Sequence, residues 1–184
     1  MIVHITDQPI NHVPCDGIIL HLFAEKRPPR GTAGAVDWLL NGFLSRYLQE
    51  ERIRGKENEI VLLPTRNRLD AQKILIFGLG RPNAFNVADF KAVWQKAGQT
   101  LLNLNLFQLV IAIPILSAKY PHPEGSTLAS AMIGGLLEGI KKSGGDTKLF
   151  QVYLTDFSEL KTKQIKNTFR EQIAALPGIQ AIGF

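Results

Sequence analysis

The chain has 184 residues, of which 45% are hydrophobic and 20% charged, and its formal net charge is +5. These values are typical of one soluble globular domain that is long enough to bury a substantial core. No apolar run reaches the length of a membrane span, and the single cysteine, Cys15, excludes an internal disulfide bond. The N-terminus lacks the basic and apolar regions of a signal peptide, so we expect a cytoplasmic protein that contacts no membrane.

Short apolar runs alternate with periodic apolar patterns along the chain. Strands are predicted over residues 1–6, 17–23, 59–63, 74–77, 109–113, 149–154 and 179–184. Helices are predicted from apolar residues at helical spacing over 36–48, 86–104, 126–140 and 158–176. Asn86 is expected to cap the second helix, and Ser126 or Thr127 the third.

The composition of the strands predicts the fold class. The runs at 17–23 and 109–113 are nearly continuous in apolar residues, which is typical of strands that are covered on both faces. Alternating strands and helices of this kind predict an α/β protein, a three-layer α/β/α sandwich around a mostly parallel but mixed sheet. No internal repeat or linker divides the chain, so we predict a single domain over residues 1–184.

A glycine turn follows the strand at 74–77. The sequence Gly78-Leu79-Gly80 leads from this strand towards the capped helix, a layout that often binds phosphate. The third glycine of a dinucleotide fingerprint is missing, because Pro82 and Asn83 follow Arg81. We therefore predict a structural turn at this position.

Three blocks, taken in order and at their spacing, resemble a known family. They are Gly34-Ala-Val-Asp-Trp-Leu-Leu-Asn-Gly-Phe-Leu44, Arg54-Gly-Lys-Glu-Asn-Glu-Ile-Val-Leu-Leu-Pro64, and Lys73-Ile-Leu-Ile-Phe-Gly-Leu-Gly-Arg81. Together they look like the N-terminal domain of the M17 leucyl aminopeptidases, over residues 16 to 114. The resemblance implies a macro-domain-like fold that packs beside a catalytic domain and helps to build a hexamer.

The resemblance does not extend to the catalytic half of that family, so it implies no peptidase activity. The catalytic half of that family binds two metals with a lysine and a cluster of aspartates and glutamates. After Pro114 this chain is too short for that half, and its acidic residues are spread singly. We therefore expect a stand-alone, non-catalytic domain with no catalytic residue, metal site or cofactor. Self-association into a homo-oligomer, or binding of a partner protein, is the leading functional hypothesis.

A macro-like fold also suggests a nucleotide-type ligand such as ADP-ribose, held by backbone amides of two glycine-rich loops. The resemblance places these loops at residues 30–36 and 117–125. The second loop departs from the pattern, since Ala118 and Lys119 replace glycines and two prolines remove amide donors. The candidate ligand-binding residues are Asp16, Gly31, Thr32, Ala33, Gly34, Ala35, Ser117, Ala118, Lys119 and Tyr120.

The distribution of positive charges and of histidines bears on two further functions, nucleic-acid binding and metal binding. The basic residues are scattered, so nucleic acid is not the expected partner, although a weak DNA-binding accessory role stays open as a further alternative. The four histidines lack metal-ligand spacing. His4 and His21 are expected in the core or on a sheet face, and His122 lies in the second loop.

Overall fold

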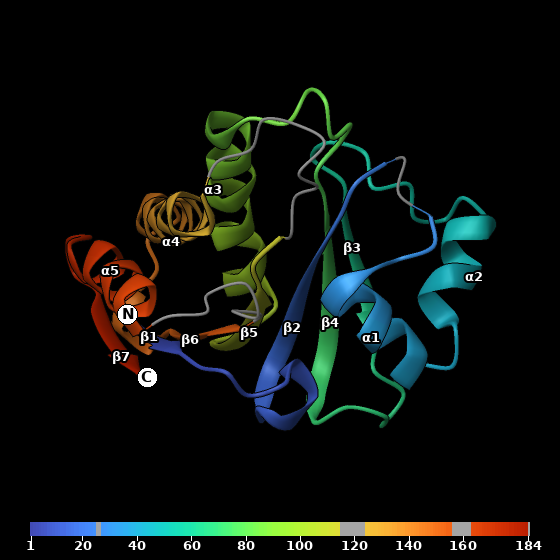
Figure 1. Cartoon of the computed structure of the whole chain (residues 1–184), viewed down its shortest axis with the longest axis horizontal. Coiled ribbons are helices and arrows are strands. Elements are labelled where there is room, and N and C mark those ends of the chain that lie inside the picture. Colours follow the sequence, from blue (N-terminus) through green and yellow to red (C-terminus); the bar gives the residue numbers. More distant parts are fainter. Residues whose placement is uncertain (25–26, 115–123, 156–162, 184) are drawn as a thin grey trace.

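The computed structural model describes residues 1–24, 27–114, 124–155 and 163–183. Within these residues the chain forms a seven-stranded sheet in the order β3-β4-β2-β5-β6-β1-β7 (Figure 1). All neighbouring strands are parallel except β3 and β4, which form an antiparallel pair. This mixed, mostly parallel sheet confirms the predicted fold class.

The described secondary structure follows the alternation predicted from the sequence. The strands are β1 (Ile2–Ile5), β2 (Cys15–Leu22), β3 (Ile60–Pro64), β4 (Ala71–Gly78), β5 (Gln108–Ala112), β6 (Gln151–Thr155) and β7 (Gln180–Gly183). The helices are α1 (Gly31–Leu39), α2 (Phe43–Gln49), α3 (Val87–Asn103), α4 (Gly125–Lys142) and α5 (Lys163–Ala174), with short 3-10 turns η1 (Ile10–His12) and η2 (Thr147–Leu149).

Two hydrophobic cores lie on opposite faces of the sheet. The first core joins α3, α4 and α5 to one face, and the second joins α1 and α2 to the other (Figure 1). Neighbouring residues of one strand serve different cores: Ile19 belongs to the first, whereas Ile18 and Leu20 belong to the second. This alternation along the strands produces the three layers.

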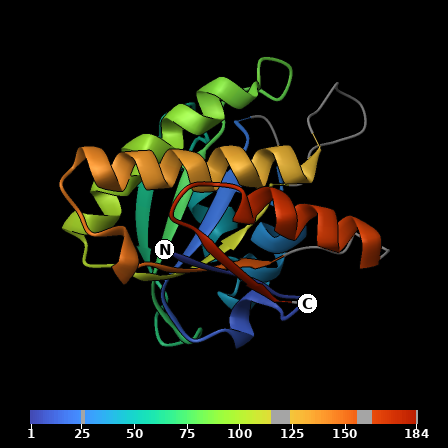
Figure 2. The same cartoon turned by 90° about the vertical axis from the view of Figure 1, so that its left-hand side faces the viewer.

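The helix layer formed by α1 and α2 does not extend over the whole sheet. In the view of Figure 2, α4 and α5 lie together above β1 and β7. On the opposite face, the buried hydrophobic residues of the second core come from β2, β3, β4, β5, the neighbouring loops, α1 and α2. Among the described residues, the end of the sheet formed by β6, β1 and β7 is therefore covered mainly on one side.

The predicted helix over 36–48 is wrong in its continuity, because the structure divides it into α1 and α2. Asn41 and Gly42 adopt left-handed backbone angles, with φ of 55° and 71°, and these angles end the first helix. Asp37 then accepts a hydrogen bond from the amide of Ser45, over 3.0 Å, and joins the two helices. The apolar periodicity continues across the break, so it did not reveal the turn.

The observed helix caps agree only in part with the caps predicted from the sequence. The Asn86 side chain accepts a hydrogen bond from the amide of Asp89, over 2.9 Å, which confirms the predicted cap of α3. The predicted caps Ser126 and Thr127 instead lie inside α4, whose N-cap is Glu124 without a side-chain hydrogen bond. No helix of the described residues is long and apolar enough to cross a membrane.

Candidate functional site

The carboxyl ends of β2 and β5 define the candidate ligand site. These strands are parallel neighbours, and the chain leaves β2 towards α1 on one face of the sheet and β5 towards α4 on the other. Open α/β sheets bind ligands at such a divergence of neighbouring connections. The sheet order thus brings together the strands that precede both loops predicted from the sequence.

The first predicted loop forms the start of α1. Gly31 has a left-handed φ of 57°, which favours glycine. A Cβ atom on Gly34 would lie 2.8 Å from the carbonyl oxygen of Pro29, so this position excludes larger residues. Thr32, Ala33 and Ala35 complete the first turns of the helix, and the Ala33 side chain is buried in the second core. The positive end of the helix dipole lies here.

The second predicted loop cannot be placed beside the first. Ser117, Ala118, Lys119 and Tyr120 lie outside the described residues, as does His122. The described chain ends β5 at Ala112 and begins α4 at Gly125. The first loop is therefore the part of the predicted ligand site that the structure positions.

Asp16 lies away from these loops. It is the second residue of β2, at the amino end, whereas α1 follows the carboxyl end of the strand. One carboxylate oxygen, Oδ2, accepts hydrogen bonds from the amides of Phe107 and Gln108, over 2.9 and 2.8 Å. Asp16 therefore anchors the start of β5, and the structure separates it from Gly31 and its neighbours.

The glycine turn after β4 uses its backbone amides within the protein. Those of Gly78, Leu79 and Gly80 donate to the carbonyls of Glu59, Leu22 and Gly55, over 2.8, 2.8 and 2.9 Å. A Cβ atom on Gly78 would collide with the Lys56 carbonyl. Close packing thus explains the glycine and agrees with a structural turn.

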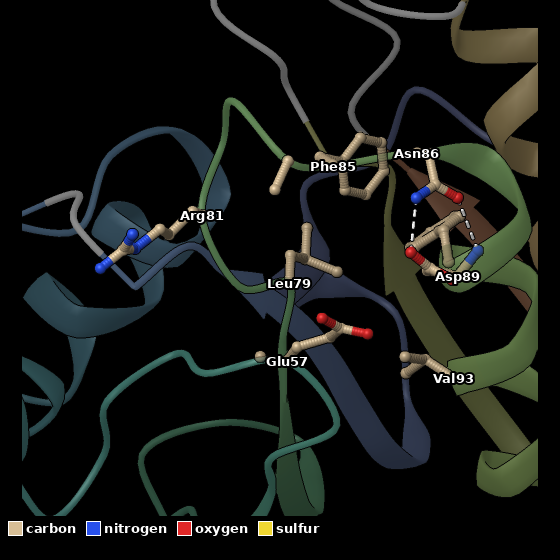
Figure 3. Close-up of a pocket in the computed structure, with 10 residues that line it drawn as sticks. Glu57, Leu79, Arg81, Phe85, Asn86, Asp89 and Val93 are labelled. Atoms are coloured by element: carbon tan, nitrogen blue, oxygen red, sulfur yellow. Dashed lines mark hydrogen bonds between the residues drawn. The ribbon is translucent and has the colours of Figure 1, made fainter.

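A small cavity lies beside this turn (Figure 3). Its lining includes Glu57, Phe85 and Asp89, and its volume is about 20 Å³, enough for one water molecule. Asn86 and Asp89 are bonded to each other across the start of α3, and the Arg81 side chain extends away from the cavity. The cavity is too small for a nucleotide. No sequence motif indicates this cavity, because its walls come from three separate segments.

His21 lies near the carboxyl end of β2, within the first core. Its Nδ1 is 3.0 Å from the Ala112 carbonyl oxygen, and its ring packs near Phe90 and Trp94. The Nε2 of His21 and the Nε1 of Trp94 are both buried, and neither has a hydrogen-bond partner within the described parts of the chain. Burial lowers the pKa of His21 from 6.5 to about 4, so the ring is neutral at physiological pH. Among the described residues, no cluster of three metal-ligating side chains occurs.

A second candidate surface lies on the less covered end of the sheet. Parallel register places Tyr153, His4 and Ile182 side by side on one face, with Gln151, Ile2 and Gln180 in the adjacent row. We call these six residues the open sheet face. Val110, next in the first row, is fully buried, whereas Ile182 at the edge is 40% exposed.

The side chains of the open sheet face carry no formal charge at neutral pH. The rings of His4 and Tyr153 stack with centroids 4.4 Å apart. Burial also lowers the pKa of His4, which favours its neutral form. The surface is thus uncharged and partly apolar, which suits a protein–protein contact.

The fold defines a macrodomain-like protein. A *Trypanosoma brucei* macrodomain solved in complex with ADP aligns with 92% of this chain and 67% of its own, with a TM-score of 0.67 and 14% identity. The macrodomain of *Mycobacterium tuberculosis* DarG aligns with 86% of this chain and 99% of its own, with a TM-score of 0.65 and 8% identity. A tomato leucine aminopeptidase mutant aligns with 92% of this chain and 35% of its own, with a TM-score of 0.68 and 16% identity.

Sequence comparison identifies the family within this class. The model of the cytosol aminopeptidase family, N-terminal domain, matches residues 19–141, and the chain therefore belongs to this family. The match extends beyond the resemblance seen up to residue 114 and includes most of α4.

Two curated relatives illustrate the extent of the match. A probable cytosol aminopeptidase of *Sulfurihydrogenibium* is 24% identical over 117 residues, covering 59% of this chain and 23% of the relative. The probable cytosol aminopeptidase of Burkholderia orbicola is 28% identical over 112 residues, covering 61% of this chain and 21% of the relative. The chain thus spans less than a quarter of the length of these relatives.

Proposed function

We propose that this domain acts without catalysis of its own, in the cytoplasm, by self-association through the open sheet face. The observation that carries the proposal is the exposure of Ile182, 40%, on a row that includes His4 and Tyr153. Burial of such a surface against a second copy would remove apolar area from water. Because the face is uncharged, two copies with a formal net charge of +5 each can meet there without direct like-charge contacts.

Analytical ultracentrifugation over a range of concentrations tests the proposal. We expect wild-type protein to associate reversibly and Ile182→Asp to remain monomeric, because the new charge would be buried in the interface. Leu62→Asp is the matched control: Leu62 is 44% exposed and lies on β3, at the opposite edge of the sheet. A monomeric wild type, or equal loss of association in both variants, would contradict the proposal.

The start of α1 supports a second candidate function, the binding of ADP-ribose or a related nucleotide. Gly31 and Gly34 allow the backbone to turn closely at the positive end of a helix, a geometry that suits a diphosphate. The similar *Trypanosoma brucei* macrodomain was solved with ADP, which supports the same ligand class.

Calorimetry with ADP-ribose and ADP tests this candidate. Gly34→Ala is expected to abolish binding, because the new Cβ would displace the Pro29 carbonyl. Gly134→Ala, inside α4 and outside both predicted loops, is the control, since an added Cβ there comes no closer than 4.0 Å to its nearest neighbour, Lys91 Cε. Absence of binding heat for the wild type at millimolar ligand would exclude this function.

A further inference from the structure

A solvent-open hollow lies where α1, α2 and the β3–β4 turn meet. It has a volume of about 640 Å³, and its lining residues are Gly34, Asp37, Trp38, Leu39, Asn41, Gly42 and Arg68. This volume falls within the range of ligand sites in proteins. The hollow lies over the α1–α2 junction and not at the open sheet face.

Hydrogen bonds at the α1–α2 junction hold the backbone that lines the hollow in place. Asp37 is only 8% exposed, and its two carboxylate oxygens accept from the amide and the hydroxyl of Ser45, over 3.0 and 2.5 Å. The left-handed turn at Asn41 and Gly42 forms one wall of the hollow. The carboxylate of Asp37 is thus engaged within the protein, and the surrounding backbone is held in place.

Trp38 gives the hollow its apolar surface. Its side chain is 79% exposed, the highest exposure among the large hydrophobic residues that the structure describes. Helical side chains lean towards the preceding turn, and the residue one turn before Trp38 is Gly34, which has no side chain to cover the indole. Exposed tryptophan is unfavourable in water, but it is the residue type most enriched at the energetic centres of protein interfaces.

Two charged side chains line the hollow: the Asp37 carboxylate, which accepts hydrogen bonds from Ser45, and the guanidinium of Arg68. The charge available to a partner at the hollow is therefore positive. Arg68 lines it, and the guanidinium of Arg66, in the same turn, lies 4.1 Å from the ring centroid of Phe43 at the start of α2. In the described chain, neither arginine forms an ion pair with a carboxylate. A second copy with the same net charge of +5 would bring further positive charge to this surface. An acidic partner is therefore favoured over self-association at this position.

We propose that this hollow binds an acidic segment of a different protein. An aromatic or aliphatic side chain of the partner covers the indole of Trp38, and its carboxylates bind Arg66 and Arg68. The stacking contact supplies most of the affinity, and the arginines supply selectivity for acidic sequences. This binding goes beyond the proposed self-association, because it uses a different surface and does not require the open sheet face.

Calorimetry with a defined peptide tests the proposal. The probe is a short peptide of aspartate and glutamate with one central phenylalanine, titrated at low salt. Trp38→Ala and Arg68→Glu are each expected to weaken binding by about tenfold or more. Leu149→Ala and Lys148→Glu are the matched controls: both residues are exposed, they lie on η2, and their variants are expected to bind as the wild type does. A peptide with lysine in place of each acid is expected not to bind.

Four outcomes would overturn the proposal. The acidic peptide could fail to bind wild-type protein at millimolar concentration, or bind all four variants equally. A single-stranded oligodeoxynucleotide could bind in its place and lose affinity in Trp38→Ala and Arg68→Glu, which would assign the surface to nucleic acid. Sedimentation could show self-association that Trp38→Ala abolishes and Ile182→Asp does not, which would assign the surface to a second copy.

Discussion

Asp16 shows how a polar residue beside a strand can be structural. The resemblance to macro-like folds suggested a ligand-binding residue, and in the structure its carboxylate accepts hydrogen bonds from two amides at the start of β5. The sequence could not show this role, because Phe107 and Gln108 lie 91 and 92 positions further along the chain. Local spacing in the sequence reveals an anchoring residue of this kind only where its hydrogen-bond partners are close in the chain.

Replacement of Asp16 by alanine is expected to lower stability. Hydrogen bonds to a charged acceptor each contribute about 1.5–3 kcal/mol, and Asp16→Ala leaves two backbone amides without their acceptor. Asp16→Asn keeps one acceptor oxygen and is expected to lose less. Urea unfolding measures the difference, and an unchanged midpoint for Asp16→Ala would show that these bonds contribute no net stability.

His21 predicts a dependence of stability on pH. Well above pH 6.5 the histidine is neutral in both the folded and the unfolded chain, so there it contributes nothing to the pH dependence. As the pH falls, the unfolded chain takes up the proton first, because the folded pKa is lowered to about 4 by burial. Stability is therefore expected to fall between about pH 6.5 and pH 4, by about 3 kcal/mol for this residue.

Urea unfolding at several pH values, in wild type and His21→Gln, checks this expectation. The variant lacks the titrating ring, so its stability is expected to change less over the same range. His4 acts in the same direction in both proteins, since its pKa is also lowered, and the comparison removes its contribution. The same slope in both proteins would refute the assignment to His21.

At the scale of elements, the sequence predicted the order and type of the strands and helices and missed some boundaries. Apolar periodicity reports which residues face a core, so it located α3 correctly. It could not reveal the α1–α2 break, because Val36 and Leu44 on either side both face the second core. The α4 cap was missed because Glu124 begins the helix without a side-chain hydrogen bond.

The α3–α4 contact depends on glycines that periodicity alone does not explain. A Cβ atom on Gly139 would collide with the Gln95 carbonyl, so α4 approaches α3 closely at this point. Gly134, five residues earlier, has free space, with Lys91 Cε 4.0 Å from an added Cβ. Gly139→Ala is expected to destabilise by about 1–3 kcal/mol through overpacking. Gly134→Ala is expected to stabilise by about 0.5–1 kcal/mol, because alanine favours the helix.

Chemical unfolding of these two variants separates packing from helix propensity. Both changes add the same methyl group to the same helix, so opposite signs can arise only from the local space. If Gly139→Ala were as stable as Gly134→Ala, the helices would have to move apart without loss, and the close approach would have no energetic importance.

At the scale of the whole molecule, one sheet serves both cores. Ile74 and Ile76 of β4 belong to the second core, whereas Leu75 and Phe77 belong to the first. A strand that loses its packing on one face therefore also loses the order that it needs on the other. The two cores are expected to unfold in a single cooperative transition, although they share no side chain.

Two matched substitutions test this coupling. Ile53 lies in the second core and Ile133 in the first, and both are fully buried. Ile53→Val and Ile133→Val are each expected to lower stability by about 0.5–1.5 kcal/mol. In a Trp38→Phe background the remaining tryptophan, Trp94, reports only on the first core. Its fluorescence is nevertheless expected to shift its midpoint in Ile53→Val as much as circular dichroism does. If the Trp94 transition stayed in place while circular dichroism shifted, the two layers would unfold independently.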